Sequence, residues 1–103
     1  MFVKLAVDGS VTLEDRDNFR TFKLVIEGGP ARLDQARRAL MNTAELPDQA
    51  SAWIYEQGLR QRPEVAGDEQ WQGNFSAMIE KARPHGWIDE QKKAIKAHIE
   101  WLP

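Results

Sequence analysis

The sequence predicts an α+β fold in which a small antiparallel N-terminal sheet of two or three strands is followed by about four helices packed on it. Residues 2–7 and 21–27 are short apolar runs rich in β-branched and aromatic side chains, which is typical of strands. After Gly28-Gly29-Pro30, apolar residues return at every third or fourth position, which indicates helices. A chain of 103 residues is the usual size for one core, so residues 1–103 are predicted to form a single domain.

The two N-terminal strands are predicted from alternating apolar positions. Side chains at alternate positions share one face of a strand. The first strand has an apolar face of Val3, Leu5 and Val7, and the second has one of Phe22, Leu24 and Ile26. A tight-turn signal at residues 8–10 favours a further strand over residues 11–13. Residues 12–19 also fit a short helix capped by Thr12, with Asp15 as the capping-box acid. Both interpretations of residues 12–19 stay open.

Four helices are predicted over residues 31–45, 48–60, 68–83 and 89–101. Pro30 is favoured in a first helical turn, and Asp68 is a typical N-cap for the third helix. Each segment carries an apolar stripe at helical spacing. The stripe of the third helix is Trp71, Phe75, Met78, Ile79 and Ala82, and that of the last helix is Ala94, Ile95, His98, Ile99 and Leu102.

Composition excludes several classes of protein. The sequence contains no cysteine, which removes disulfides, thiolate metal sites and cysteine nucleophiles. The apolar run after Met1 is interrupted by Lys4 and ends at Asp8, so it does not resemble a signal peptide. No stretch approaches the ~20 apolar residues of a membrane helix. We therefore expect a cytoplasmic protein with no membrane partner and no cofactor, and the net charge of −2 indicates no strongly charged partner.

His85 is the first candidate for a functional side chain, because it lies in a Pro-His-Gly turn beside Trp87 and imidazole titrates near neutral pH. No acidic residue at a fixed local spacing accompanies it. His98 lies on the apolar stripe of the last predicted helix, where a core or interface role is expected. Two histidines thirteen residues apart match no zinc spacing, so no metal site and no catalytic residue is predicted.

The tryptophans divide into two pairs. Trp53 and Trp71 fall on the inner stripes of predicted helices, where a core role is the better explanation. Trp87 lies in a loop and Trp101 near the end of the sequence, and exposed tryptophan is enriched at interface hot spots. Trp87, Trp101 and His85 are therefore the candidate interaction surface.

Two further sets of side chains are candidates. Tyr55, Arg60 and His85 are the polar groups of a ligand pocket between sheet and helices, proposed on residue type alone. An anionic partner would be contacted by Arg32, Arg37, Arg38, Arg60 and Arg62. No aromatic residue is interleaved with these arginines, so a solvated helix face is the preferred interpretation and nucleic acid is disfavoured as a partner.

The function class is reached by elimination. None of the serines lies in a Gly-x-Ser-x-Gly elbow, and no nucleophile has a predicted base. The leading hypothesis is a small, non-enzymatic binding or regulatory module that engages another protein, or itself as a homodimer. The alternatives are a small-molecule-binding protein or minor enzyme, and a weak nucleic-acid binder.

Overall fold

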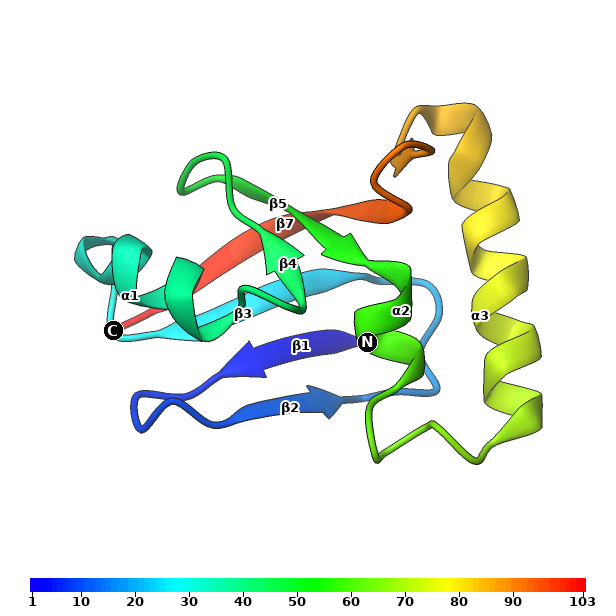
Figure 1. Ribbon diagram of the computed structural model, residues 1–103, viewed down its shortest axis with the longest axis horizontal. Coiled ribbons are helices and arrows are strands. Elements are labelled where there is room, and N and C mark those ends of the chain that lie inside the picture. The colour runs from blue at the N-terminus through cyan, green and yellow to red at the C-terminus, as the bar shows by residue number, and fades with distance from the viewer.

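A seven-stranded mixed sheet is the centre of the molecule, and β7 (Ala94–Leu102) is its longest strand. The computed structural model describes all 103 residues (Figure 1). The strand order is β2-β1-β3-β7-β5-β4, and β6 pairs with β7 off this path. The other strands are β1 (Phe2–Leu5), β2 (Val11–Glu14), β3 (Lys23–Glu27), β4 (Ala44–Glu45), β5 (Ser51–Tyr55) and β6 (Ile88–Asp89). The helices are α1 (Leu33–Ala39), α2 (Glu56–Arg60) and α3 (Glu69–Ala82), with 3₁₀ turns at Pro30–Arg32 and Arg83–His85.

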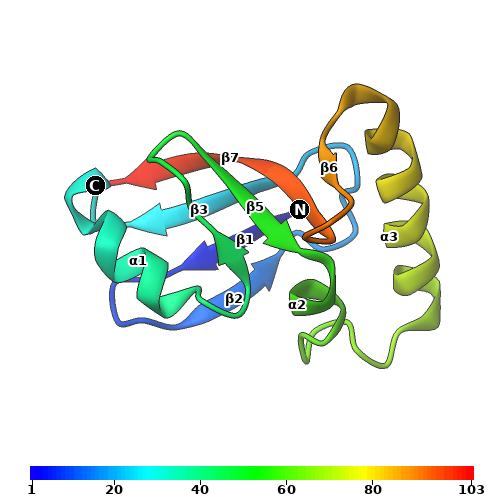
Figure 2. The ribbon, with the colours of Figure 1, turned by 45° about the horizontal axis from the view of Figure 1, so that its top comes forward.

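The helices lie toward opposite ends of the sheet. β1, β3 and β7 run parallel to one another, whereas β2, β5 and β6 are antiparallel to the strands they pair with. α1 lies near the end where β7 finishes, and α3 crosses the other end, roughly perpendicular to the strands (Figures 1 and 2). α2 lies between β5 and α3. None of the helices has the length and apolar character needed to cross a membrane.

One face of the sheet packs on the core and the other is covered only by its own long side chains. Twenty buried residues from strands and helices form one continuous core. On the opposite face Lys23 pairs with Glu100 at 3.1 Å, and Lys4 approaches Glu27 at 3.9 Å. Val25 between them is only 3% exposed. Antiparallel and mixed sheets commonly alternate in this way between an apolar and a polar face.

Two side chains cover the outer edge of β2. The carboxylate of Glu64 accepts the N–H of Leu13 at 2.8 Å, and the guanidinium of Arg62 donates to the carbonyl of Val11. Arg62 and Glu64 also pair with each other at 3.1 Å. An open strand edge invites pairing with other chains. The N–H of Leu13 and the carbonyl of Val11 on this edge are therefore satisfied from within the molecule.

The predicted arrangement of a small antiparallel sheet with four helices is wrong. The sheet has seven strands, and only three α-helices are present. Residues 11–14 form a strand and not a helix, but β3 does not pair antiparallel with β2 as a small antiparallel sheet in chain order would require. Instead β3 lies on the far side of β1 and runs parallel to it, with Val3 in register with Leu24. The order of strands depends on which distant segments pair, and local apolar runs do not specify this.

The segment predicted as the last helix, residues 89–101, contains the end of β6, a turn and most of β7. Ile95, Ala97 and Ile99 are buried, and the residues between them are exposed, which is the period of a strand. Ile95 and Ile99 also fit a helical stripe, so periodicity alone was ambiguous. β7 is a strand because β3 and β5 pair with it along its two edges.

The helices predicted over residues 48–60 and 31–45 are also corrected. Residues 51–55 form β5, in which Ala52 and Ile54 face the core, and only Glu56–Arg60 are helical. The preceding helix is limited to Leu33–Ala39, and the chain enters β4 at Ala44. Trp, Ile and Tyr favour strands, and pairing of β5 with β7 overrides the helical spacing of the same segment.

α3 coincides with the helix predicted over residues 68–83. The carboxylate of Asp68 accepts the N–H of Trp71 at 3.0 Å, as an N-cap does. This hydrogen bond, supported by the charge of Arg16, lowers the pKa of Asp68. Trp71, Phe75 and Ile79 are buried on the inner side of the helix. The N-cap and the apolar stripe depend only on residues close together in the chain, so the sequence was sufficient to predict this helix.

Gly73 lies at an exposed position inside α3, and a Cβ atom there would meet nothing within 4 Å. Gly73→Ala is expected to raise the free energy of unfolding by about 0.5–1 kcal/mol, because alanine loses less backbone entropy in a helix. Gly86→Ala is the matched control. Gly86 has equally open surroundings but a φ of +76°, so alanine there should lower stability by about 1 kcal/mol. Urea unfolding of both variants measures the two signs, and a loss in Gly73→Ala would contradict the prediction.

Candidate functional site

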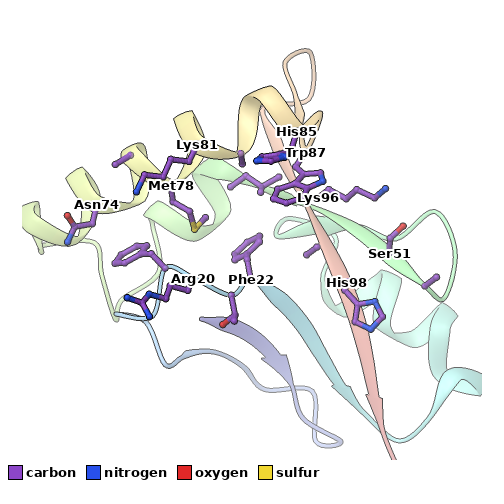
Figure 3. A pocket seen from close by; sticks show the side chains of 17 residues that line it. Arg20, Phe22, Ser51, Asn74, Met78, Lys81, His85, Trp87, Lys96 and His98 are labelled. Carbon is purple, nitrogen blue, oxygen red and sulfur yellow. The ribbon is translucent and has the colours of Figure 1, made fainter.

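A cavity with a volume of about 710 Å³ lies between α3 and the end of the sheet. We call it the α3 cavity (Figure 3). Its size is in the usual range of small-molecule sites. Its walls are the loop Phe19–Phe22, the start of β5 at Ala50–Ser51, the side of α3 from Asn74 to Ala82, His85 and Trp87, and residues 95–98 of β7.

The cavity lies where β7 exchanges one strand partner for another. β6 is in register with β7 at Ala94 and Ile95, and β3 reaches β7 only from His98 onward. Lys96 and Ala97 lie between these two partners. Four consecutive residues of β7 line the cavity although their side chains alternate between the two faces, so the cavity meets the strand at its edge.

The backbone ladder ends at this point. The N–H of Lys96 donates to the carbonyl of Trp87 at 2.8 Å. In a complete antiparallel pair the N–H of Trp87 would return to the carbonyl of Lys96, but it turns to the carbonyl of Ala82 at 3.5 Å. The end of α3 is thereby joined to β7 beside the cavity.

Much of the cavity surface is apolar. Phe22 and Met78 approach each other across it from the sheet side and from α3 (Figure 3). Phe19, Trp87 and Ile95 extend this surface. An apolar lining with a few polar groups is the usual composition of small-molecule sites.

Every charged residue of the lining is basic. Arg20, Lys81 and Lys96 contribute cations, His85 and His98 contribute imidazoles, and no Asp or Glu lines the cavity. The ten ion pairs of the molecule involve other cations. Three cations of the lining therefore have no carboxylate partner, which leaves them available to an anion.

One carboxylate, that of Asp48, lies close enough to sense the charge of Lys96. The pKa of Asp48 is lowered chiefly by hydrogen bonds from the N–H groups of Ala50 and Ser51, with a smaller effect from the charge of Lys96. The carboxylate is thus committed to closing the turn before β5 and is not part of the cavity lining.

His85 and Trp87 stack on each other at the α3 end of the cavity. Their ring centroids are 4.4 Å apart and the ring planes differ by 18°. Gly86 between them adopts the left-handed conformation with a φ of +76°, which ends the 3₁₀ turn and brings the two rings together. Trp87 remains 48% exposed.

Trp101 does not share a surface with Trp87. It lies five residues beyond Lys96 along β7, about 17 Å away at the rise of a strand. Its indole N–H donates to the carbonyl of Gln49 at 2.7 Å and its ring packs against the core. The predicted interaction surface therefore has only His85 and Trp87 in one place.

The predicted pocket residues are also separated. Arg60 does not reach the cavity, because its guanidinium binds Glu56 at 3.0 Å, Gln72 at 2.8 Å and Ser76 at 2.8 Å. It also lies over the ring of Phe75, 4.9 Å from the centroid. Arg60 thus joins α2 to α3. Tyr55 is outside the cavity lining, and only His85 of the predicted trio is part of it.

The predicted anion-contact arginines do not form one free basic face. Arg62 is held at the edge of β2, and Arg37 donates to the carbonyls of Leu46 and Pro47. Arg32 donates to Gln35 and to the carbonyl of Val7. Arg60 is held between α2 and α3, and Arg38 alone of the five forms no side-chain hydrogen bond or ion pair.

The basic residues of the cavity were missed by sequence reasoning. Arg20, Lys81 and Lys96 are far apart in the sequence, and only the fold brings them to one cavity. Lys96 and His98 did carry a signal: two residues apart in an alternating segment, they share one side of a strand. The helical interpretation of residues 89–101 concealed it.

The site contains no assembled nucleophile. Ser51 is the register partner of His98 and both line the cavity, but no hydrogen bond joins the hydroxyl to the imidazole. In Figure 3 the two side chains point in different directions. No group of three or more His, Asp or Glu side chains that could hold a metal ion occurs in the molecule. The arrangement is suited to binding an anion.

Neither family models, nor curated proteins, nor solved structures include a match to this chain.

Proposed function

We propose that this protein is a small-molecule-binding module whose α3 cavity takes an organic anion with an apolar body. The observation that carries the proposal is the charge of the lining: three cations without ion pairs, no carboxylate, and apolar side chains between them. A carboxylate or phosphate group on the ligand would meet charge-assisted donors, and its apolar part would be removed from water.

The cations lie around the apolar centre of the cavity. Arg20 comes from the loop before β3, Lys81 from α3, and Lys96 from β7 (Figure 3). Their separation in the fold favours a ligand that is larger than a simple inorganic ion. The protein has no cysteine, so it forms no disulfide and does not need an oxidising compartment to fold. We therefore propose the cytoplasm as its location.

Protein contact is the second candidate, and the exposed ring of Trp87 favours it, since tryptophan anchors many interfaces. In this proposal Trp87 and His85 would bind a side chain of another protein or of a second copy. Four of the five arginines considered for nucleic acid are engaged within the molecule, which removes the support for that alternative.

The charge of the cavity can be tested with naphthoate and its neutral counterpart naphthamide. Calorimetric or NMR titration is expected to show that naphthoate binds and that naphthamide binds more weakly. Lys81→Gln/Lys96→Gln should weaken naphthoate binding about tenfold, because each exposed charge pair contributes up to about 1 kcal/mol. Added salt should weaken naphthoate binding by screening.

The matched control is Arg38→Gln/Lys93→Gln. Both residues are exposed cations without an ion pair and lie outside the cavity lining, so the net charge changes equally. This variant should bind naphthoate like the unaltered protein. Equal losses in both double variants would show only a general charge effect. Absence of binding by naphthoate and by an aromatic phosphate such as adenosine monophosphate would remove the anion-site proposal and leave protein contact as the remaining candidate.

A further inference from the structure

We infer that the ligand of the α3 cavity is a planar aromatic anion, whose ring stacks on the free face of Trp87 while its anionic group is bound by the neighbouring cations. This inference rests on the proposed function and specifies the ligand further. The carrying observation is the stack of His85 and Trp87 at the cavity wall.

Trp87 is held in a fixed position. Its carbonyl accepts the N–H of Lys96 from β7, and its N–H donates to the carbonyl of Ala82 at the end of α3. Gly86 turns the chain so that His85 packs on one face of the indole, with the two planes 18° apart. A ring held in this way loses little conformational entropy when a ligand binds.

His85 is the aromatic ring that stacks on Trp87, and no second ring stacks on the other face of the indole. Figure 3 shows His85 on the α3 side of the indole and Phe22 toward the opposite side. Trp87 remains 48% exposed, and no cation lies over its ring. Val7 and Met41 are the other large exposed apolar residues, and neither lines the α3 cavity. Trp87 is thus the large exposed apolar side chain that the cavity presents to a ligand.

The remaining apolar lining suits a flat ligand. Phe22 and Met78 lie between Trp87 and the far end of the cavity, and both ring and thioether make favourable contacts with aromatic groups. The backbone N–H of Lys96 donates to the carbonyl of Trp87, so the residue that carries this cation is the strand neighbour of Trp87. A ligand with a ring and an anion in one molecule would use both features.

Two kinds of metabolite share this chemistry. An aryl carboxylate carries its charge on the ring or a short chain, and a mononucleotide carries it on phosphate beyond a ribose. Both contain a planar π system and an anionic group. Either is compatible in size with a cavity of about 710 Å³.

The decisive comparison is between naphthoate and decalin carboxylate, its fully saturated analogue with the same carbon skeleton and charge. Burial of hydrocarbon alone would favour the saturated ring, so a preference for naphthoate reports stacking. We expect naphthoate to bind about three- to tenfold more tightly, as stacking free energies of aromatic pairs imply. Trp87→Leu should remove this preference, and Trp87→Phe should retain part of it.

Titration with adenosine monophosphate and with ribose phosphate distinguishes the two kinds of ligand, an aryl carboxylate and a mononucleotide. Binding of the nucleotide, but not of the sugar phosphate, with the same dependence on Trp87 would assign the site to a nucleotide. Naphthoate binding without nucleotide binding would assign it to an aryl carboxylate. The thermal midpoint of Trp87→Leu should remain close to that of the unaltered protein, since the side chain is half exposed.

The outcomes distinguish this inference from the proposal beneath it. If decalin carboxylate binds as tightly as naphthoate and both lose affinity in Lys81→Gln/Lys96→Gln, the aromatic inference is overturned and the anion site stands. A preference for naphthoate that persists in Trp87→Leu also overturns it. If naphthoate, decalin carboxylate and adenosine monophosphate all fail to bind, the anion site fails and the aromatic inference fails with it.

Discussion

Trp71→Ala is expected to lower the free energy of unfolding by about 3–5 kcal/mol, the range for removing a large buried aromatic side chain. Trp71 is 1% exposed and stacks on Phe75 with ring centroids 4.8 Å apart. It also approaches Phe19 at 5.9 Å, and its indole N–H donates to the carbonyl of Arg16 at 2.8 Å. The truncation would leave a cavity and an unpaired carbonyl.

The effect should extend to the α3 cavity. Trp71 joins α3 to the loop that precedes β3, and Phe19–Phe22 of that loop form one wall of the cavity. Urea unfolding measures the loss of stability. Naphthoate titration of the folded fraction measures whether ligand affinity falls when this wall of the cavity is disturbed. For the unfolding measurement alone, Trp87→Ala is the matched control, with an expected change below about 1 kcal/mol because Trp87 is half exposed. Equal losses in the two variants would contradict the assignment of Trp71 to the core.

Glu64→Ala is expected to lower the free energy of unfolding by about 1–3 kcal/mol at neutral pH, as for loss of hydrogen bonds to a charged group. The Glu64 carboxylate accepts the N–H of Leu13 and pairs with Arg62, which itself binds the carbonyl of Val11. Its removal would open the outer edge of β2. We therefore also expect self-association that rises with protein concentration, measured by sedimentation.

The difference in free energy of unfolding between Glu64→Ala and the unaltered protein should depend on pH. Burial by itself raises the pKa of Glu64, but hydrogen bonds from Arg62 and from the N–H of Leu13 outweigh it, so the pKa is lowered in the folded protein. A carboxyl with a lowered folded pKa stabilises the fold above its unfolded pKa, near 4.3. That contribution is lost as the pH falls through the folded pKa. Urea unfolding from pH 7 to pH 3 should show the gap between Glu64→Ala and the unaltered protein closing below about pH 4. A gap that stays constant over this range would contradict the assigned role of the carboxylate.

The candidate site shows how far local sequence reasoning reaches. His85 and Trp87 were selected because a Pro-His-Gly turn next to tryptophan is a local feature, and their role in binding stays a prediction. Arg20, Lys81 and Lys96 come from three separate segments, and no spacing relates them. The arginines that were selected proved to be engaged with neighbouring backbone and side-chain groups, which only the tertiary contacts could reveal.

The sequence by itself determined the features that depend on neighbouring residues. These are the strand-forming runs before Gly28, the change of period at Gly28-Gly29-Pro30, and α3 with its Asp68 cap and buried stripe. Each reflects hydrogen bonding or burial within a few residues of the chain. The tertiary structure alone decided that residues 94–102 form a strand, since their apolar positions fit both periods and the pairing with β3 and β5 favoured one. The tertiary structure also determined the α3 cavity. Strand pairing brings its lining segments together, and nothing local in the sequence indicates that these distant segments meet.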